Sequence, residues 1–258
     1  MKLGLFNDTP EPSLTLWGIG TTRSRPKQSG GESVFYIGLD RKRGVFDQDA
    51  GRETRHTLGF RAFGQFPTLD YNFDAFLQLG SFKTSAGADN IRAWAVSADI
   101  GYVVNHTNFK LRLGVRGDVT SGDPNPKDNV LHTFNPLLPG TTYSDTIGLI
   151  GASNSIAVFP NLRLLPKKNI TITFGPAFFW RHSTRDGIYS INVSPLRTGQ
   201  LSKSRFVGAQ PSFRFDWSIQ RHWSCTAILS AFETGNFLKE TPPGKSTSYV
   251  TSWLTFRF

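Results

Sequence analysis

The residues with the clearest chemical potential are cations that recur on one face of the predicted strands. In the segment 109–120, Lys110, Arg112 and Arg116 alternate with apolar residues, and Asp118 shares their face. Alternate residues of a strand point to opposite sides of a sheet, so such side chains gather on one surface. Because guanidinium and ammonium groups bind carboxylates, the pattern predicts an anion-binding surface. Its predicted residues are Arg55, Arg61, Lys110, Arg112, Arg116, Asp118, Arg163, Arg181, Arg214, Asp216 and Arg257, with Asp74 and Asp99 on the same face.

Two interpretations of this charged face remain open. Arg–Asp pairs can brace a wide sheet, which explains part of the pattern. The excess of cations over carboxylates is better explained by a water-filled, positive lumen, because rings of Arg or Lys select anions. Low-dielectric walls also focus the field of such groups. An Arg or Lys that faces lipid at the bilayer midplane costs ~2–4 kcal/mol, so the face must be wet or ion-paired.

The elements that carry these residues are roughly eleven segments of alternating polarity, long enough to cross a bilayer at a tilt. Short turns at 67–69, 105–108, 166–169 and 220–222 alternate with longer polar connections at 41–53, 121–151, 182–205 and 239–245. Outer-membrane barrels show this rhythm. We therefore expect an all-β fold, an antiparallel transmembrane β-barrel. The expected strands are 14–22, 33–39, 55–66, 70–79, 92–104, 109–120, 153–165, 170–181, 207–219, 223–233 and 246–258.

The last expected strand, 246–258, alternates strictly and ends in aromatic residues. Val250 and Leu254 share one face, whereas Trp253 and Arg257 share the other. A terminal aromatic strand of this kind resembles the closing strand of a bacterial outer-membrane barrel, where it also serves as the assembly signal. This resemblance implies Phe256 and Phe258 as the signal, with barrel-assembly machinery and outer-membrane lipid as partners.

Composition supports a membrane barrel over other classes. The chain has 258 residues, 13% of them aromatic, which suits aromatic girdles at both membrane interfaces. It lacks a run of about 18 apolar residues, so no transmembrane helix is expected. The net charge is +10, but the basic residues are spread along the strands, and we expect no nucleic-acid partner. A single cysteine, Cys225, allows no internal disulfide.

The sequence contains no convincing catalytic or metal-binding motif. The five histidines are scattered without the spacing of metal ligands, and the glycine-rich stretches lack the context of a phosphate loop. Asp74 and Asp99 are a weak candidate for a carboxylate pair, since nothing fixes their separation. We expect no enzyme activity, no metal and no cofactor. An outer-membrane hydrolase or acyltransferase is a weaker alternative, without a Ser–His motif to support it.

The sequence of the first part of the chain indicates a domain boundary near residue 12. Residues 1–12 are expected to be disordered or non-native, and residues 13–258 to form the barrel domain. The N-terminus is not a signal peptide, because Asn7, Asp8 and Pro10 break its short apolar stretch. Counting strands back from the last one places the start of the first strand outside the cell. We therefore expect the chain to be the C-terminal part of a larger barrel.

Four ordered motifs carry a family resemblance. They are V-R-G-D-V-T-S-G-D-P-N-P with H-T-F-N-P-L-L-P-G within 115–140, F-F-W-R-H-S-T-R-D-G-I-Y at 178–189, a third at 39–56 and R-A-W-A-V-S-A-D-I-G-Y at 92–102. Together with the closing W-L-T-F-R-F, they resemble the alginate export family of outer-membrane barrels, from about Leu14 to Phe258. The first motif places Phe134, Asn135 and Pro136 in an extracellular loop.

The resemblance implies a large monomeric barrel with an arginine-rich conduit for a polyuronate chain. By motif matching it assigns Arg55, Arg116, Asp118, Arg181 and Arg257 to that conduit. The expected function is export of an anionic exopolysaccharide, an alginate-like polyuronate, across the bacterial outer membrane. The alternative is a general anion-selective porin without a polymer role.

Overall fold

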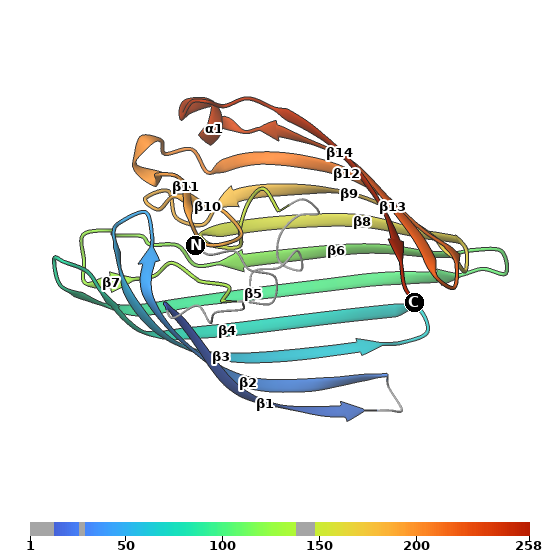
Figure 1. The fold of residues 1–258 in the computed structure, drawn as a ribbon, viewed down its shortest axis with the longest axis horizontal. Helices are drawn as coiled ribbons and strands as arrows, with labels where there is room; N and C mark the ends of the chain where they lie inside the picture. Colours follow the sequence, from blue (N-terminus) through green and yellow to red (C-terminus); the bar gives the residue numbers. More distant parts are fainter. Residues whose placement is uncertain (1–12, 26–28, 138–147) are drawn as a thin grey trace.

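The protein is an all-β chain built on one long antiparallel meander, as a computed structural model shows (Figure 1). The structure describes residues 13–25, 29–137 and 148–258, so the N-terminal segment 1–12 lies outside the described residues. Within these described residues, eleven strands follow one another in a single hydrogen-bonded order, which confirms the predicted fold class. They are β1 (Leu14–Arg25), β2 (Gly30–Val45), β3 (Ala50–Gln65), β4 (Leu69–Lys83), β5 (Ala88–Asn105), β6 (Lys110–Thr120), β8 (Ser155–Lys167), β9 (Ile170–Arg181), β12 (Phe206–Gln220), β13 (Trp223–Thr234) and β14 (Thr247–Phe256).

The remaining elements are small and lie at one end of the sheet. β7 (Val130–Leu131) pairs in parallel with β5, and β10 (Ile188–Tyr189) pairs with β11 (Pro195–Arg197). The helix α1 (Asn236–Glu240) follows β13. Figure 1 shows these pieces at the left, the short turns at the right, and a strongly curved sheet that runs from β1 in blue to β14 in red. Within the described residues no helix is both long and apolar enough to cross a membrane.

Several strands are longer than the sequence pattern predicts. The connection expected at 41–53 is mostly strand, because β2 continues to Val45 and β3 begins at Ala50. Ion pairs between strands hold this extension, with Arg52 bonded through two nitrogens to Asp40 and Arg41 bonded to Glu53. Hydrophobic alternation is absent there because polar groups occupy both faces, so the pattern gives no strand signal.

One face of the sheet, here called the outer face, is apolar. Leu58, Val96 and Val115 project from it and are exposed. Aromatic side chains also gather on it: the Tyr36 hydroxyl lies 2.7 Å from Nδ1 of His56, and the Trp17 and His56 ring centroids are 6.3 Å apart. An apolar belt with aromatic residues is what a lipid-facing barrel wall requires.

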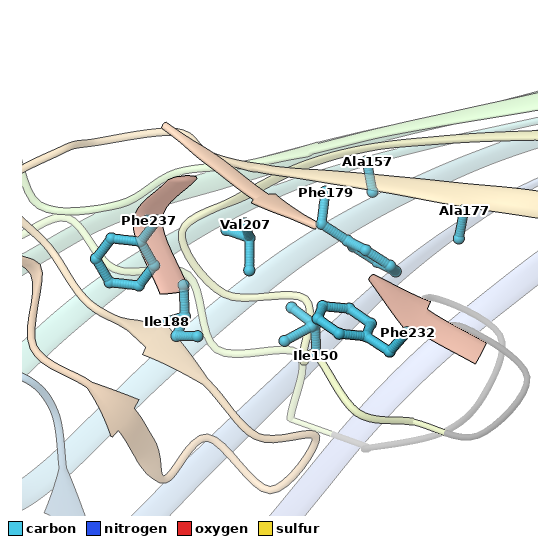
Figure 2. Close-up of a cluster of buried hydrophobic side chains, with 8 residues drawn as sticks. All are labelled: Ile150, Ala157, Ala177, Phe179, Ile188, Val207, Phe232 and Phe237. Atoms are coloured by element: carbon cyan, nitrogen blue, oxygen red, sulfur yellow. The ribbon is translucent and has the colours of Figure 1, made fainter. Parts of the chain in front are cut away.

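The opposite face, here called the inner face, is covered at the end away from the short turns. We call the covering residues 121–137, 148–154 and 182–205 the cap. The Phe134 ring packs on Ala93 and Ala95 of β5, with Phe76 of β4 beside it. Ile150 and Ile188 of the cap join Phe179, Phe232 and Phe237 in a second buried cluster (Figure 2). The cap thus has its own hydrophobic contacts with the sheet.

Candidate anion-binding groove

The predicted site residues lie in four places of the structure. Most lie along a groove on the uncovered part of the inner face: Lys110, Arg112, Arg116, Arg163, Arg214 and Asp216. Arg55 and Arg181 lie under the cap and are fully buried. Arg61 and Asp118 line a smaller hollow beside the cap, and Arg257 follows the end of β14.

The groove consists of two adjoining hollows of about 620 Å³ and 650 Å³. Four residues line both hollows: Asp99 of β5, Arg163 of β8, Thr171 of β9 and Asp216 of β12. Of the residues that the structure describes, five cationic side chains and three carboxylates line the two hollows. The groove is therefore positive, but less so than the sequence pattern alone suggests.

Arg112 is the most fully paired cation of the groove. Its Nη2 donates to Asp70 and Asp99, and its Nε donates to both oxygens of Asp70. The guanidinium has room because Gly101 and Gly114, neighbours on β5 and β6, lack side chains: a Cβ on Gly114 would lie 2.2 Å from its Nη1. Charge-assisted bonds of this kind are the strong ones. The two glycines thus leave space for the Arg112 side chain, and the two carboxylates hold it against the strands.

Arg116 and Arg214 are each paired within their own strand. The Nε of Arg116 lies 3.1 Å from Oδ2 of Asp118, and its guanidinium carbon lies 3.9 Å from the centre of the Phe159 ring. Arg214 bonds through two nitrogens to Asp216, at 2.7 and 2.8 Å. Residues two apart on a strand share a face, so the sequence places both pairs correctly. Pairing leaves each site close to neutral.

Arg163 and Lys110 differ from the other groove cations. Neither has a carboxylate oxygen within 4.0 Å among residues 13–25, 29–137 and 148–258. Arg163 stands directly opposite Arg112 in the β6–β8 register. Like charges in this position destabilise a sheet, so the two carboxylates on Arg112 relieve the repulsion. The exposed Arg163 supplies positive charge where the two hollows join.

Arg55 lies in a closed polar network, which differs from its predicted place in the conduit. It is 0% exposed, and its Nε donates to Glu53 at 2.7 Å. Its Nη1 donates to Gln78 and to the Thr133 carbonyl of the cap. Because the cap covers Arg55 and supplies one of its acceptors, this arginine holds the cap to β3 and is not part of the groove wall.

Arg181 is likewise withdrawn from the groove. Among the described residues its side chain donates only to backbone carbonyls, those of Thr184, Asp186, Gly199, Ser202 and Ser204. Its guanidinium carbon lies 4.0 Å from the centre of the Phe237 ring on α1. A cation that satisfies so many carbonyls organises the chain around it. Arg181 therefore positions the segment 182–205.

Asp186 joins the two main parts of the cap. One oxygen accepts from Thr133 Oγ1 at 2.6 Å and from the Asp123 backbone N–H, and the other accepts from the Tyr189 hydroxyl at 2.6 Å and the Gly187 N–H. Asp186 is fully buried. That burial raises the pKa of its carboxyl to about 6, although the four hydrogen bonds favour the charged form.

The motif Phe134-Asn135-Pro136 turns inward. Asn135 donates from Nδ2 to Glu53, and its carbonyl accepts from Gln78. Phe134 and Asn135 are buried, and the motif lines a hollow of about 230 Å³ with Arg61 and Asp74. The sequence places this motif in a long connection; it does not show that the connection folds back onto the inner face.

The predicted assembly signal lies at an exposed edge. Phe256 ends β14 and contacts the Trp223 ring, with the ring centroids 5.0 Å apart. The Arg257 backbone pairs with His222, whose Nδ1 lies 2.7 Å from the Arg257 carbonyl oxygen. Arg257 thus lies at the short-turn end, apart from the residues that line the two hollows. Its role in a conduit and the assembly role of Phe256 and Phe258 stay predictions.

Some site residues are not evident from sequence reasoning. Glu53, Gln78 and Asp186 hold the cap, and Trp253 lines the groove. The alternation of β4 and β14 gives the inward direction of Gln78 and Trp253 but not their role. Glu53 lies where alternation is absent, and no local signal marks the partners of Asp186. The described part of the chain contains no cluster of three or more His, Cys, Asp or Glu side chains suited to a metal ion.

The chain is similar to a known protein family. The model of the family described as alginate export matches residues 8–252, nearly the whole chain. No curated protein matches the sequence.

Proposed function

Because the chain belongs to the alginate export family, a family of outer-membrane transport proteins, we propose that its inner groove conducts an anionic polyuronate. The family membership establishes a β-barrel fold, an outer-membrane location and a general role in polysaccharide export. The proposal concerns the finer point, which is that the groove cations contact the carboxylates of the polymer as it passes.

The observation that carries the proposal is the unequal pairing of Arg112 and Arg163. Arg112 is neutralised by Asp70 and Asp99, whereas Arg163 reaches no carboxylate of the described residues. A cation left unpaired at the junction of two hollows is available to a mobile anion. Its contact with a uronate is solvated and therefore weak, as conduction along many sites requires. Lys110, in the second hollow, is a second such contact.

A general anion-selective porin is the alternative, since Arg163 and Lys110 would also attract small anions. The width of the groove favours a polymer: the two joined hollows amount to far more space than a chloride ion needs. A porin and a polysaccharide conduit differ in how a polymer affects small-ion current.

The experiment is a current recording on the refolded protein in planar bilayers with potassium chloride. Oligomers of mannuronate and guluronate are added to one side. In the proposed function they reduce the chloride current at concentrations at which equally long maltooligosaccharides do not. A chloride-selective current that the uronate oligomers leave unchanged would support the porin, and a cation-selective current would exclude both.

A further inference from the structure

Trp253 is an aromatic residue on the inner face. The attraction of anions by the groove cations does not explain why a tryptophan lies there. In the β13–β14 register it stands opposite Thr226, which in turn stands opposite Asp216 on β12. The three residues therefore form one row across the inner face. Trp253 lines the first hollow with Arg214 and Arg163, and 43% of its surface is exposed. A large apolar ring is thus left open to a polar groove.

Polar side chains of β12 and β13 lie beside the Trp253 ring and are held in place by hydrogen bonds to one another. The guanidinium carbon of Arg214 lies 5.9 Å from the centre of the Trp253 ring. Asp216 holds Arg214 through two bonds, and Thr226 Oγ1 donates to Asp216 at 2.8 Å. The Nη1 of Arg214 has no hydrogen bond to any described residue, which leaves its donors to the groove.

The tryptophans of the outer face have a different explanation. Trp217 of β12 is 39% exposed and shares its face with Phe213 and Ile219, where aromatic residues meet the membrane interface. Trp253 points the other way, to Arg214, Asp216 and Thr226, so lipid contact does not account for it. Neither does core packing, because no apolar cluster of the described residues includes it.

We propose that Trp253 and Arg214 form a saccharide subsite, in which the indole stacks on a pyranose ring and Arg214 binds its carboxylate or hydroxyl groups. The face of an indole is electron-rich and attracts the weakly positive C–H groups of a sugar ring. It offers nothing comparable to a small inorganic anion. Thr171, Thr173 and Ser212 supply hydroxyl groups along the same hollow. The pairing of ring and cation fits a uronate, which combines a pyranose ring with a carboxylate.

This inference rests on the proposed function and selects a sugar chain over other polyanions. The test compares an octamer of mannuronate with an octamer of glutamate, which carries similar charge and no sugar ring. Binding to the refolded protein in detergent is measured by isothermal titration calorimetry. Trp253→Leu should weaken mannuronate binding roughly five- to tenfold, the size of an aromatic stacking contribution, and leave glutamate binding unchanged. Trp253→Phe should keep most of the affinity.

Trp217→Leu is the matched control, because it removes a tryptophan of similar exposure from the outer face of a nearby strand. It should change neither affinity. Labelling with 5-fluorotryptophan gives a second readout on the unsubstituted protein: mannuronate should shift the fluorine resonance of Trp253 and not that of Trp217. Equal effects of Trp253→Leu on both octamers, or no effect on either, would overturn the subsite and leave the conduit standing. Failure of the unsubstituted protein to bind either octamer would overturn the proposed function itself.

Discussion

Arg112 and Arg163 stand directly opposite each other on β6 and β8, yet only Arg112 is paired with carboxylates. Two arginines in register would repel each other if both were free. Asp70 of β4 and Asp99 of β5 form ion pairs with the guanidinium of Arg112. Arg163 therefore remains the cation that faces the groove. The relationship separates a structural arginine from one that is available to a ligand.

The first prediction concerns this difference. Arg163→Gln should lower the anion-to-cation permeability ratio by more than Arg214→Gln does, because Arg214 is already neutralised by Asp216. Reversal potentials across a potassium chloride gradient measure the ratio. Both variants should remain folded, since each side chain lies in a wet groove. An equal loss in the two variants would mean that ion pairing does not decide which cation acts.

The space beside Arg112 gives a second prediction. In Gly114→Val the new Cβ would meet Nη1 of Arg112 at 2.2 Å, so the guanidinium must leave Asp70 and Asp99. The two freed carboxylates should reduce anion selectivity, while valine suits a strand and keeps the fold. Gly117→Val on the same strand is the control, because nothing lies within 4 Å of its added Cβ. A control that lost as much selectivity would refute the role of the glycine.

A third prediction tests which way the side chains of β6 face. Val115 is exposed on the outer face, so Val115→Arg should cost ~2–4 kcal/mol at mid-bilayer and reduce the folded fraction. Arg116→Glu should assemble normally and lose anion selectivity, because it places a carboxylate beside Asp118 on the inner face. The shift of the unheated band on a denaturing gel reports assembly. If the two outcomes were exchanged, the assignment of faces would be wrong.

The cap should respond to pH through Asp186. Its folded-state pKa of about 6 lies above the ordinary value of 3.8, so the folded cap binds more protons between these values. Cap stability is therefore greatest below about pH 4 and falls as the pH rises to about 6. Burial also raises the pKa of Asp123, which acts in the same direction, and the nearby Asp47 disfavours the ionised form of Asp186.

Hydrogen exchange of residues 121–137 checks this expectation. After correction for the intrinsic rate, opening should be roughly tenfold rarer at pH 4.5 than at pH 7.5. Asp186→Asn should remove most of that difference, whereas Asp128→Asn, at an exposed position of the cap, should retain it. A cap that opened more readily at pH 4.5 would show that Asp186 is stabilised as a carboxylate.

The sequence predicts the sheet better than the cap. Lipid on one side and water on the other impose a strict period of two, so the directions of Val115, Arg116 and Arg163 follow from alternation alone. The partners of Arg55 and Arg181 do not. Arg55 donates to Thr133, which is 78 residues away, and Arg181 binds carbonyls of a segment without regular alternation. Contacts between distant irregular segments leave no periodic signal, so two buried arginines look the same in sequence as two conduit residues.

The most direct test of the proposed conduit is release of a labelled uronate oligomer from proteoliposomes that contain the protein. An end-labelled mannuronate octamer should leave the vesicles faster than a maltooctaose of the same length, and Arg163→Gln should slow the mannuronate and not the neutral sugar. Release of both oligomers at equal rates, unaffected by Arg163→Gln, would contradict an anion-selective polysaccharide conduit.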